Sequence, residues 1–392
     1  MPEAVIVSAT RTAIGTFGGI LAATPATDLA AVVIKAALER AKISPESVDE
    51  VILGNVLSAG VGLNPARIAA LAAGVGQQVG SYTVNKACGS GLKAVALAAS
   101  AIRGGEAQVI VAGGMENMSL APYLLRKARF GYRLGDGALL DSMIADGLQC
   151  PITLVHMGVT AENIATRYQI SRREQDEFAA QSQSRYFAAL HAGKFASEIT
   201  PVSVTRGKEK IEFKVDEHPR QTSAEAIASL RPAFKADGTV TAANASGIND
   251  GAAAVVVMAR EAALAAGVRP MAKIRAWAAA GVDPAYMGMG PVPAVDKALS
   301  LAGLRREEIG LWELNEAFAA QSLGVLRELK LNQARVNVNG GAIALGHPVG
   351  ASGARILTTL LYAMADRGER LGVATLCIGG GQGIAMVVEQ EV

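Results

Sequence analysis

The sequence contains few cysteine, histidine or aromatic residues, and it has no surplus of one charge. Three residues are cysteine, four are histidine and 4% are aromatic, while 37 basic residues nearly balance 35 acidic ones. Three cysteines form no disulfide framework, and a net charge of +2 argues against nucleic-acid binding. No apolar run approaches the roughly 20 residues that span a bilayer, so we expect no membrane-spanning segment.

Targeting signals are also missing. The chain does not open with a basic segment followed by a long apolar run, which would mark a signal peptide, but enters a strand-like pattern at residues 4–8. Residues 389–392 do not match a peroxisomal address. Together with the scarcity of cysteine, these absences predict a protein of the reducing cytoplasm.

Alanine, valine and glycine carry most of the apolar content. Hydrophobic residues make up 51% of the 392-residue chain. This length is sufficient for two or three domains with substantial cores. Small apolar side chains suit tightly packed α/β layers with close contacts between helices.

The first of three notable motifs surrounds Cys88, in the segment 85–92. Apolar residues recur at helical spacing from Leu92 to Ile102, which predicts a helix just after the cysteine. A helix N-terminus offers unpaired N–H groups and the positive end of the dipole, and both favour a thiolate. We therefore predict a lowered pKa and a nucleophilic sulfur for Cys88. The alternative is a small buried cysteine before a core helix.

The second motif surrounds His347, in the segment 339–353. This histidine lies among five glycines, directly before an expected helix at 354–365. A structural histidine usually fills a gap or caps a turn, whereas small neighbours leave space for a ligand. The motif is therefore a candidate binding or catalytic loop.

The third motif contains Cys377, which follows the strand-like run 373–376 and precedes a glycine bend at 379–381. Such a cysteine is inert in many proteins, but a glycine run also supplies free N–H donors for an oxyanion. Two cysteines and a histidine, each in a glycine-rich loop, fit acyl transfer better than packing.

Together these loops resemble those of the thiolase family, most closely its biosynthetic branch, which joins two acetyl-CoA molecules. The resemblance covers nearly the whole chain, beginning at Val5–Thr12. Further matching segments are 113–119, 244–251 and 315–320. It implies reversible Claisen condensation to acetoacetyl-CoA and CoA through an acetyl-Cys88 intermediate.

The two ends of the chain repeat the same order of elements. The paired segments are 41–53 with 302–314, 90–103 with 352–367, and 109–114 with 373–376. Asn55 and Asn315 fall at nearly the same place in the two copies. Strands alternate with helices in each half, which predicts largely parallel sheets covered by helices.

The middle of the chain has no counterpart in this repeat. Its character differs: it holds charged helical runs, and Ser171 with Glu174 matches a capping box. Since 252–258 looks like a further strand of the first half, we interpret the middle as an insertion. The predicted domains are 1–118 (completed by 244–268), the inserted loop domain 119–243, and 269–392.

The resemblance implies an α/β fold: a thiolase-like five-layered αβαβα sandwich of two pseudo-two-fold-related halves. The inserted loop domain then covers the active site and binds CoA. It also implies a homotetramer, a dimer of dimers.

The resemblance assigns the chemical roles. Cys88 takes the acyl group, His347 accepts its proton, and Cys377 deprotonates Cα of the second acetyl-CoA. The enolate oxygen is assigned to His347 and a water held by Asn315, and the acyl-enzyme oxyanion to the N–H groups of Cys88 and Gly379. Without the resemblance, Asn315 is an ordinary asparagine at a strand-to-helix turn.

The resemblance also implies contacts to CoA thioesters, which are substrates; no metal and no tightly bound cofactor is expected. The implied contacts are Leu148, His156, Met157, Arg220, Leu230, Phe234, Ala242, Ser246, Met287, Ala317 and Phe318. Arg220 is able to stack on adenine and meet phosphate, though it also fits a solvated surface charge. Ala226 stands where the family often has a serine, so one nucleotide contact is missing. Cys150 receives no role beyond burial.

Four other classes of protein share part of this pattern of residues. A ketoacyl synthase uses two histidines, or histidine and asparagine, and lacks the Cys377 loop. A non-catalytic acyl-CoA-binding protein needs only the pocket, and a papain-like hydrolase has a different cysteine signature. A degradative 3-ketoacyl-CoA thiolase is the closest alternative. The methionines in 155–158 and 287–290 favour a short acyl pocket, unless they merely fill the core.

Overall fold

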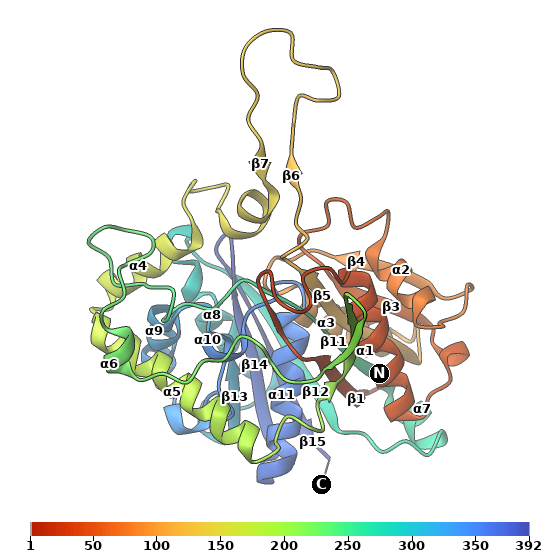
Figure 1. Cartoon of the computed structure of the whole chain (residues 1–392). Helices are drawn as coiled ribbons and strands as arrows, with labels where there is room; N and C mark the ends of the chain where they lie inside the picture. Colours follow the sequence, from red (N-terminus) through yellow and green to blue (C-terminus); the bar gives the residue numbers. More distant parts are fainter. Residues whose placement is uncertain (1, 392) are drawn as a thin grey trace.

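The computed structural model describes residues 2–391, in which one mixed sheet of eleven strands divides into two similar parts (Figure 1). The first part contains β1 (Ala4–Thr12), β3 (Glu50–Gly54), β4 (Gly80–Val84), β5 (Val109–Asn117) and β11 (Asn249–Ala259). The second part contains β12 (Ala272–Gly281), β13 (Leu311–Leu314), β14 (Leu371–Ile378) and β15 (Gln382–Gln390). Short β2 (Gly15–Thr16) and β8 (Ile199–Thr200) pair with β11 and β1.

The strand order is the same in both parts. It runs β1-β11-β5-β3-β4 in the first and β12-β15-β14-β13 in the second, and the parts join where β1 pairs with β12 over only two residue pairs. Each joining strand carries an irregularity at the same place, between Ile6 and Ser8 in β1 and between Ile274 and Ala276 in β12. Because the two halves agree even in the position of a single bulge, the internal repeat predicted from sequence is confirmed.

The strand register shifts one predicted equivalence by a residue. Asp49 N–H donates to Val109 O, and Gly310 N–H donates to Leu371 O, which aligns these two strand starts. Counting onward, Asn315 corresponds to position 54 and Glu316 to position 55. Asn55 and Asn315 are therefore not equivalent, because a one-residue offset turns a side chain to the other face of the sheet.

Helices form the remaining layers. α1 (Ala26–Ala41) and α2 (Pro65–Ala72) cover the outer face of the first part, while α8 (Pro291–Ala302) and α9 (Ala319–Leu329) cover that of the second. Between the two parts lie α3 (Ser90–Gly104) and α11 (Ser352–Arg367), which pack on each other and on both parts of the sheet (Figure 1). The predicted five-layered α/β fold is confirmed, and the two central helices carry the sequence motifs at their starts. The prediction of largely parallel sheets is wrong, because β11 and β15 each pair antiparallel with both of their neighbours, and only β13/β14, β3/β4 and β3/β5 are parallel among the long strands.

The insertion lies between β5 and β11, which are adjacent antiparallel strands. Its elements are β6 (Tyr123–Leu124), β7 (Leu140–Asp141), a π-helix (Met143–Leu148), α4 (Met157–Arg167), α5 (Arg172–His191), β8, β9 (Val202–Arg206), β10 (Glu209–Phe213) and α6 (Ala224–Ile227). α5 begins with the predicted capping box of Ser171 and Glu174. The segment bounded by β6 and β7 forms an arm that projects from the body (Figure 1).

Two short helices complete the fold, α7 (Arg260–Ala265) and α10 (Ala342–Leu345), with 3₁₀ turns at Pro45–Ser47, Pro284–Met289, Arg306–Glu308 and Gln333–Arg335. Among residues 2–391, we find no helix whose length and apolarity would let it cross a bilayer.

Candidate active site

The starts of α3 and α11 meet at the centre of the molecule. A Cβ atom on Gly91 would lie 2.9 Å from the α11 backbone, and one on Gly353 would lie 2.3 Å from the α3 backbone. Only glycine permits this approach, since such distances are too short for any side chain. The two loops that precede these helices, carrying Cys88 and His347, are thereby brought together as the pseudo-symmetry predicts.

The Cys88 loop is held from both halves. Ser90 Oγ accepts a hydrogen bond from Lys86 N–H at 2.8 Å and donates to Ala87 O at 2.6 Å, and Ala87 has a positive φ of 43°. Lys86 Nζ donates to Gln382 Oε1 of β15 at 2.6 Å. The half-buried Cys88 therefore lies in a tight turn that is tied to a strand of the second part of the sheet.

The predicted lowering of the Cys88 pKa is wrong in direction. Burial raises the pKa of this thiol, and the N–H groups of Gly379 and of Cys88 itself, which lower it, only partly compensate. The negative charge of Glu116 raises it further. Removing the thiol from water outweighs the field of the helix start, so the resting sulfur is a thiol that needs a base.

His347 is oriented by hydrogen bonds on its own loop and from β11. Its backbone N–H donates to Asn249 Oδ1 at 2.9 Å, and its Nδ1 lies 2.5 Å from Ser352 Oγ. Ser352 Oγ donates its one proton to Pro348 O at 2.8 Å, so it accepts from His347. We infer that the imidazole carries its proton on Nδ1, which leaves the lone pair of Nε2 free to act as a base.

Burial keeps this imidazole neutral. The pKa of His347 falls to about 3 because burial disfavours the cation and because Arg355 places a positive charge nearby. Asn315 Nδ2 lies 3.5 Å from both ring nitrogens, and its Oδ1 is buried with no hydrogen-bond donor among the described residues. One polar atom of Asn315 is therefore available to a small molecule beside the histidine.

Cys377 is the penultimate residue of β14, pairs with Gly383 and is fully buried. The chain then turns sharply into β15 through Gly380 and Gly381, whose φ angles are 84° and 86°. Burial and the neighbouring Cys88 raise the pKa of the Cys377 thiol. The turn presents the N–H of Gly379 to the Cys88 sulfur, so both thiols and one backbone donor face the same small volume.

Apolar side chains predicted to contact CoA surround Cys377. Met157, Phe234, Met287, Ala317 and Phe318 all belong to its hydrophobic cluster. His156 stacks on Phe234 with ring centroids 4.7 Å apart, and Phe234 meets Phe318 edge-on at 6.1 Å. Leu148 packs instead in the cluster beside Cys88.

The other predicted CoA residues lie apart from this cluster. Arg220, Leu230 and Ala242 are exposed, and Arg220 is fixed only through its backbone N–H, which donates to Gln183 Oε1 at 2.9 Å. Ser246 N–H donates to Ala317 O at 3.0 Å, which ties its loop to the cluster. A bound nucleotide would have to reach outward to meet the exposed three.

Sequence reasoning missed several residues that shape this site. Ser352 lies within the His347 motif, five positions after the histidine, and this spacing was the available signal. Asn249 and Glu116 come from distant segments, and nothing local reveals their contacts. Cys150 is buried as predicted, but it also shares the Cys377 cluster, and although burial raises its pKa, hydrogen bonds from Thr153, Ile152 and Gly380 lower it overall.

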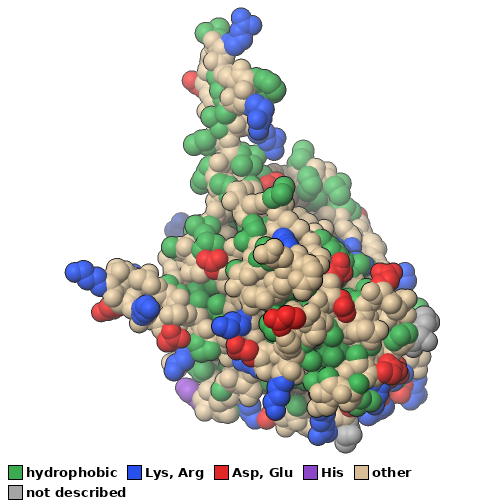
Figure 2. All heavy atoms as spheres, turned by 90° about the vertical axis from the view of Figure 1, so that its right-hand side faces the viewer, with side chains coloured by type: hydrophobic (Ala, Val, Ile, Leu, Met, Phe, Trp, Pro, Cys, Tyr) green, Lys and Arg blue, Asp and Glu red, His purple; other side chains and the backbone are tan. Residues whose placement is uncertain are grey.

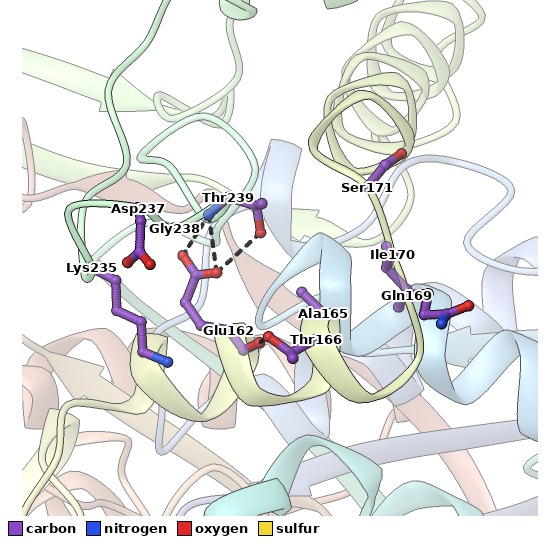
Figure 3. Close-up of a pocket in the computed structure, with 10 residues that line it drawn as sticks. All are labelled: Glu162, Ala165, Thr166, Gln169, Ile170, Ser171, Lys235, Asp237, Gly238 and Thr239. Atoms are coloured by element: carbon purple, nitrogen blue, oxygen red, sulfur yellow. Dashed lines mark hydrogen bonds between the residues drawn. The ribbon is translucent and has the colours of Figure 1, made fainter.

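A separate surface pocket of about 360 Å³ lies between α4 and the loop 235–239 (Figure 3). Glu162 is one of its lining residues, and its carboxylate accepts hydrogen bonds from the backbone and hydroxyl of Thr239 (Figure 3). The same carboxylate also accepts from Val240 N–H. Neither candidate cysteine lines it. Among residues 2–391, no three histidine, cysteine or acidic side chains gather as a metal site would require.

The comparisons with known proteins agree with this fold and site. The family "Thiolase, N-terminal domain" matches residues 4–261, and "Thiolase, C-terminal domain" matches residues 268–390. The chain therefore belongs to the thiolase family, and it is an acyltransferase enzyme.

Similar proteins are alike over their whole lengths. The chain is 62% identical to the acetyl-CoA acetyltransferase of Escherichia coli and 56% identical to that of Cupriavidus necator, with 100% of each chain covered. Among solved structures, the Bacillus anthracis acetyl-CoA acetyltransferase has a TM-score of 0.98 and human mitochondrial 3-ketoacyl-CoA thiolase one of 0.97. Both are 44% identical to this chain and cover 100% of it, with 99% of their own lengths aligned.

Proposed function

We propose that the protein is an acetyl-CoA C-acetyltransferase, which condenses two acetyl-CoA molecules to acetoacetyl-CoA and CoA and also runs in reverse. The observation that carries this proposal is the meeting of the Cys88, His347 and Cys377 loops in one buried volume. The names of relatives with 56–62% identity support the choice of substrate.

In the first half-reaction, Cys88 Sγ attacks the carbonyl carbon of acetyl-CoA while His347 Nε2 takes the thiol proton. The oxyanion accepts hydrogen bonds from the N–H groups of Cys88 and Gly379. The bond between carbon and the CoA sulfur then breaks, and CoA leaves as a thiol with the proton from His347. Acetyl-Cys88 remains.

In the second half-reaction, the Cys377 thiol first passes its proton to His347. The resulting thiolate removes a Cα proton from the second acetyl-CoA, and the enolate oxygen faces the imidazolium and Asn315. The enolate carbon attacks the acetyl carbonyl, and the Cys88 thiolate leaves and recovers its proton from His347. Because burial disfavours an isolated imidazolium, the proton stays on His347 only while a negative group faces it.

We assign the CoA thioester to the face formed by the insertion. The acyl and pantetheine path would be lined by His156, Met157, Phe234, Met287, Ala317 and Phe318. Leu148 would lie on the Cys88 side of this path, and Ser246 would support it through its backbone hydrogen bond to Ala317. Arg220, Leu230 and Ala242 would meet the nucleotide at the exposed end. We retain 1–118 with 244–268, 119–243 and 269–392 as the domains, and no other cofactor enters the chemistry.

We further propose a cytoplasmic homotetramer, a dimer of dimers. Two apolar surfaces support this assembly. The arm carries Phe130 and Leu134 at 92% and 98% exposure, and Figure 2 shows hydrophobic side chains interleaved with basic ones along its length. The second surface consists of the edge strand β4, α2 and the residue Leu63 just before α2, and it exposes Leu63, Ile68, Leu71 and Tyr82. Light scattering of the full chain should give four subunits, and deletion of 125–139 should give two.

A degradative thiolase is the second candidate, favoured by the almost equal structural similarity to the human 3-ketoacyl-CoA thiolase. The decisive experiment is CoA-dependent cleavage of acetoacetyl-CoA against 3-ketoacyl-CoA substrates of six to ten carbons. We expect kcat/KM to be highest for acetoacetyl-CoA and to fall steeply with length. A flat or rising profile would favour the degradative enzyme.

A further inference from the structure

Glu116, at the end of β5, is a buried carboxylate that the reaction above does not use. It has no exposed surface, and four donors surround it. Oε1 accepts from Asn55 Nδ2 at 2.7 Å and Leu57 N–H at 3.1 Å. Oε2 accepts from Val56 N–H at 3.0 Å and Gly350 N–H at 2.8 Å.

These contacts join three segments around the nucleophile. Residues 55–57 follow β3, Glu116 ends β5, and Gly350 belongs to the turn between His347 and Ser352. A Cβ on Gly350 would lie 2.6 Å from Met115 O and 2.7 Å from Glu116 Oε2, so the turn is pressed directly against β5. Val56 and Leu57 pack in the cluster that borders Cys88. One carboxylate therefore anchors both walls of the Cys88 environment.

The donor pattern suits an ionised carboxylate. Each oxygen accepts two hydrogen bonds, and a carboxyl proton would have to point at one of the four donors. Burial disfavours the charged form and raises the pKa of Glu116 to about 7, although the N–H groups of residues 56, 57 and 350 partly offset this rise. The titratable groups facing Glu116 are Asp250 of β11, which also raises its pKa, and the Cys88 thiol.

A second buried carboxylate holds the other end of the His347 loop. Glu316 Oε2 accepts from Ser182 Oγ at 2.7 Å and from Ile343 N–H at 3.2 Å, and Ser182 in turn accepts from Gly341 N–H at 3.0 Å. Glu316 Oε1 accepts from Asn337 at 2.8 Å. The loop is thus fixed by one carboxylate before His347 and by Glu116 after it.

We propose that Glu116 is a positioning residue for the thiolase reaction, an inference that rests on the function proposed above. Its carboxylate fixes Gly350, and the 348–352 turn then presents Ser352 to His347 Nδ1, so that Nε2 points at the Cys88 sulfur. Glu116 touches no reacting atom, and it acts through the turn and through its charge near Cys88.

The experiment replaces Glu116 by Gln in the full-length protein. An amide keeps one acceptor but sets two N–H groups against backbone donors, so the turn loses its anchor. We expect the rate of acetyl-Cys88 formation, measured by rapid quench and mass spectrometry, to fall by roughly 10- to 100-fold, the scale for a catalytic group displaced by about 1 Å. The KM for acetoacetyl-CoA should change by less than about twofold, because Glu116 lies away from the CoA path.

Alkylation by iodoacetamide supplies a readout that needs no thiolase activity. Loss of the Glu116 charge should move the pH midpoint of Cys88 alkylation to lower pH, whereas E116D, which keeps the charge, should hold the midpoint and recover part of the acylation rate. Cys150 and Cys377 are buried, so their continued resistance to alkylation shows that the variant has not loosened.

E162Q is the matched control. Glu162 is also a buried carboxylate with backbone and hydroxyl donors, but these come from Thr239 and Val240, far from the His347 turn. In E162Q, the pH midpoint of Cys88 alkylation should equal that of the unsubstituted protein. Equal acylation rates in E116Q and E162Q, or a rate loss accompanied by alkylation of Cys150 and Cys377, would overturn the proposal. If the parent fails to cleave acetoacetyl-CoA, the proposed function fails, and the Cys88 midpoints of E116Q and E116D still test the position of the charge.

Discussion

The two halves of the molecule share a scaffold but differ where their strands end. β5 and β14 are equivalent strands, and their halves agree down to the bulge in β1 and β12. The penultimate residue of β5 is Glu116, which accepts four hydrogen bonds, and β5 leads into the long insertion. The penultimate residue of β14 is Cys377, and the chain turns back directly after this strand through glycines. The scaffold is thus duplicated, whereas only one of the two strand ends carries a residue to which we assign a chemical step.

The helix starts differ in the same way. Before α3 stands Cys88, the proposed nucleophile, and before α11 stands His347, its proposed base, which is held by Ser352. On the proposed function, each half alone contains an incomplete site, and the duplicated fold builds one active site across its internal axis.

The strongest test of this asymmetry removes one sulfur at a time. Cys88→Ala should abolish acetyl-enzyme formation. Cys377→Ala should lose condensation by roughly 10³-fold or more while still acetylating Cys88, because Cys377 serves only the Cα step. Peptide mass spectrometry after incubation with acetyl-CoA reads both. An acetyl group on Cys377 or Cys150 in the parent would contradict the assignment.

The second largest effect concerns the close contact between the starts of α3 and α11, which joins the two halves. Gly353→Ala would force a Cβ to 2.3 Å from the α3 backbone, so the helix starts should separate. We expect a loss of about 1–3 kcal/mol of stability, typical of overpacking, and slower acylation of Cys88. Gly104→Ala, at the far end of α3 where the nearest atom lies at 3.5 Å, is the matched control and should leave both unchanged.

The buried, neutral His347 predicts that the stability of the fold decreases at acid pH. His347 has a pKa lowered to about 3 in the fold, against an ordinary value of 6.5. The unfolded chain therefore binds more protons below pH 6.5, and this contribution to stability, complete above 6.5, is lost as the pH falls toward 3. Thermal unfolding of His347→Asn should show a shallower decline in Tm over this range. An identical slope in both proteins would refute the prediction.

The smallest expected effect concerns acyl length. Met287 lies with Cys377 in one cluster, and a shorter side chain would open space beside the acyl group. Met287→Ala should raise kcat/KM for six-carbon 3-ketoacyl-CoA relative to acetoacetyl-CoA by a few-fold, the scale of one or two methylenes in a pocket. Met271→Ala, outside this cluster, serves as the control.

Sequence reasoning reached the fold, the repeat and the three loops because each leaves a local signal. Each loop is marked by residues close to it in the sequence. Cys88 is followed by apolar residues at helical spacing, His347 lies in a glycine-rich segment, and Cys377 follows an apolar run. The Asn55–Asn315 equivalence failed by one position, since hydrogen-bond register is not written in composition. The positioning role of Glu116 was not predicted, because its four hydrogen-bond donors come from residues 55–57 and 350, which are distant in the sequence.

The sequence by itself determined the alternation of strands and helices, the duplication and the types of reactive side chain, because these follow from periodicity and from local propensity. Only the tertiary structure decided the ionisation of those side chains. The helix start alone argued for a Cys88 thiolate, but burial raises the pKa of the thiol and lowers that of His347. Desolvation depends on everything that packs around a group, and those neighbours come from parts of the chain more than two hundred residues apart.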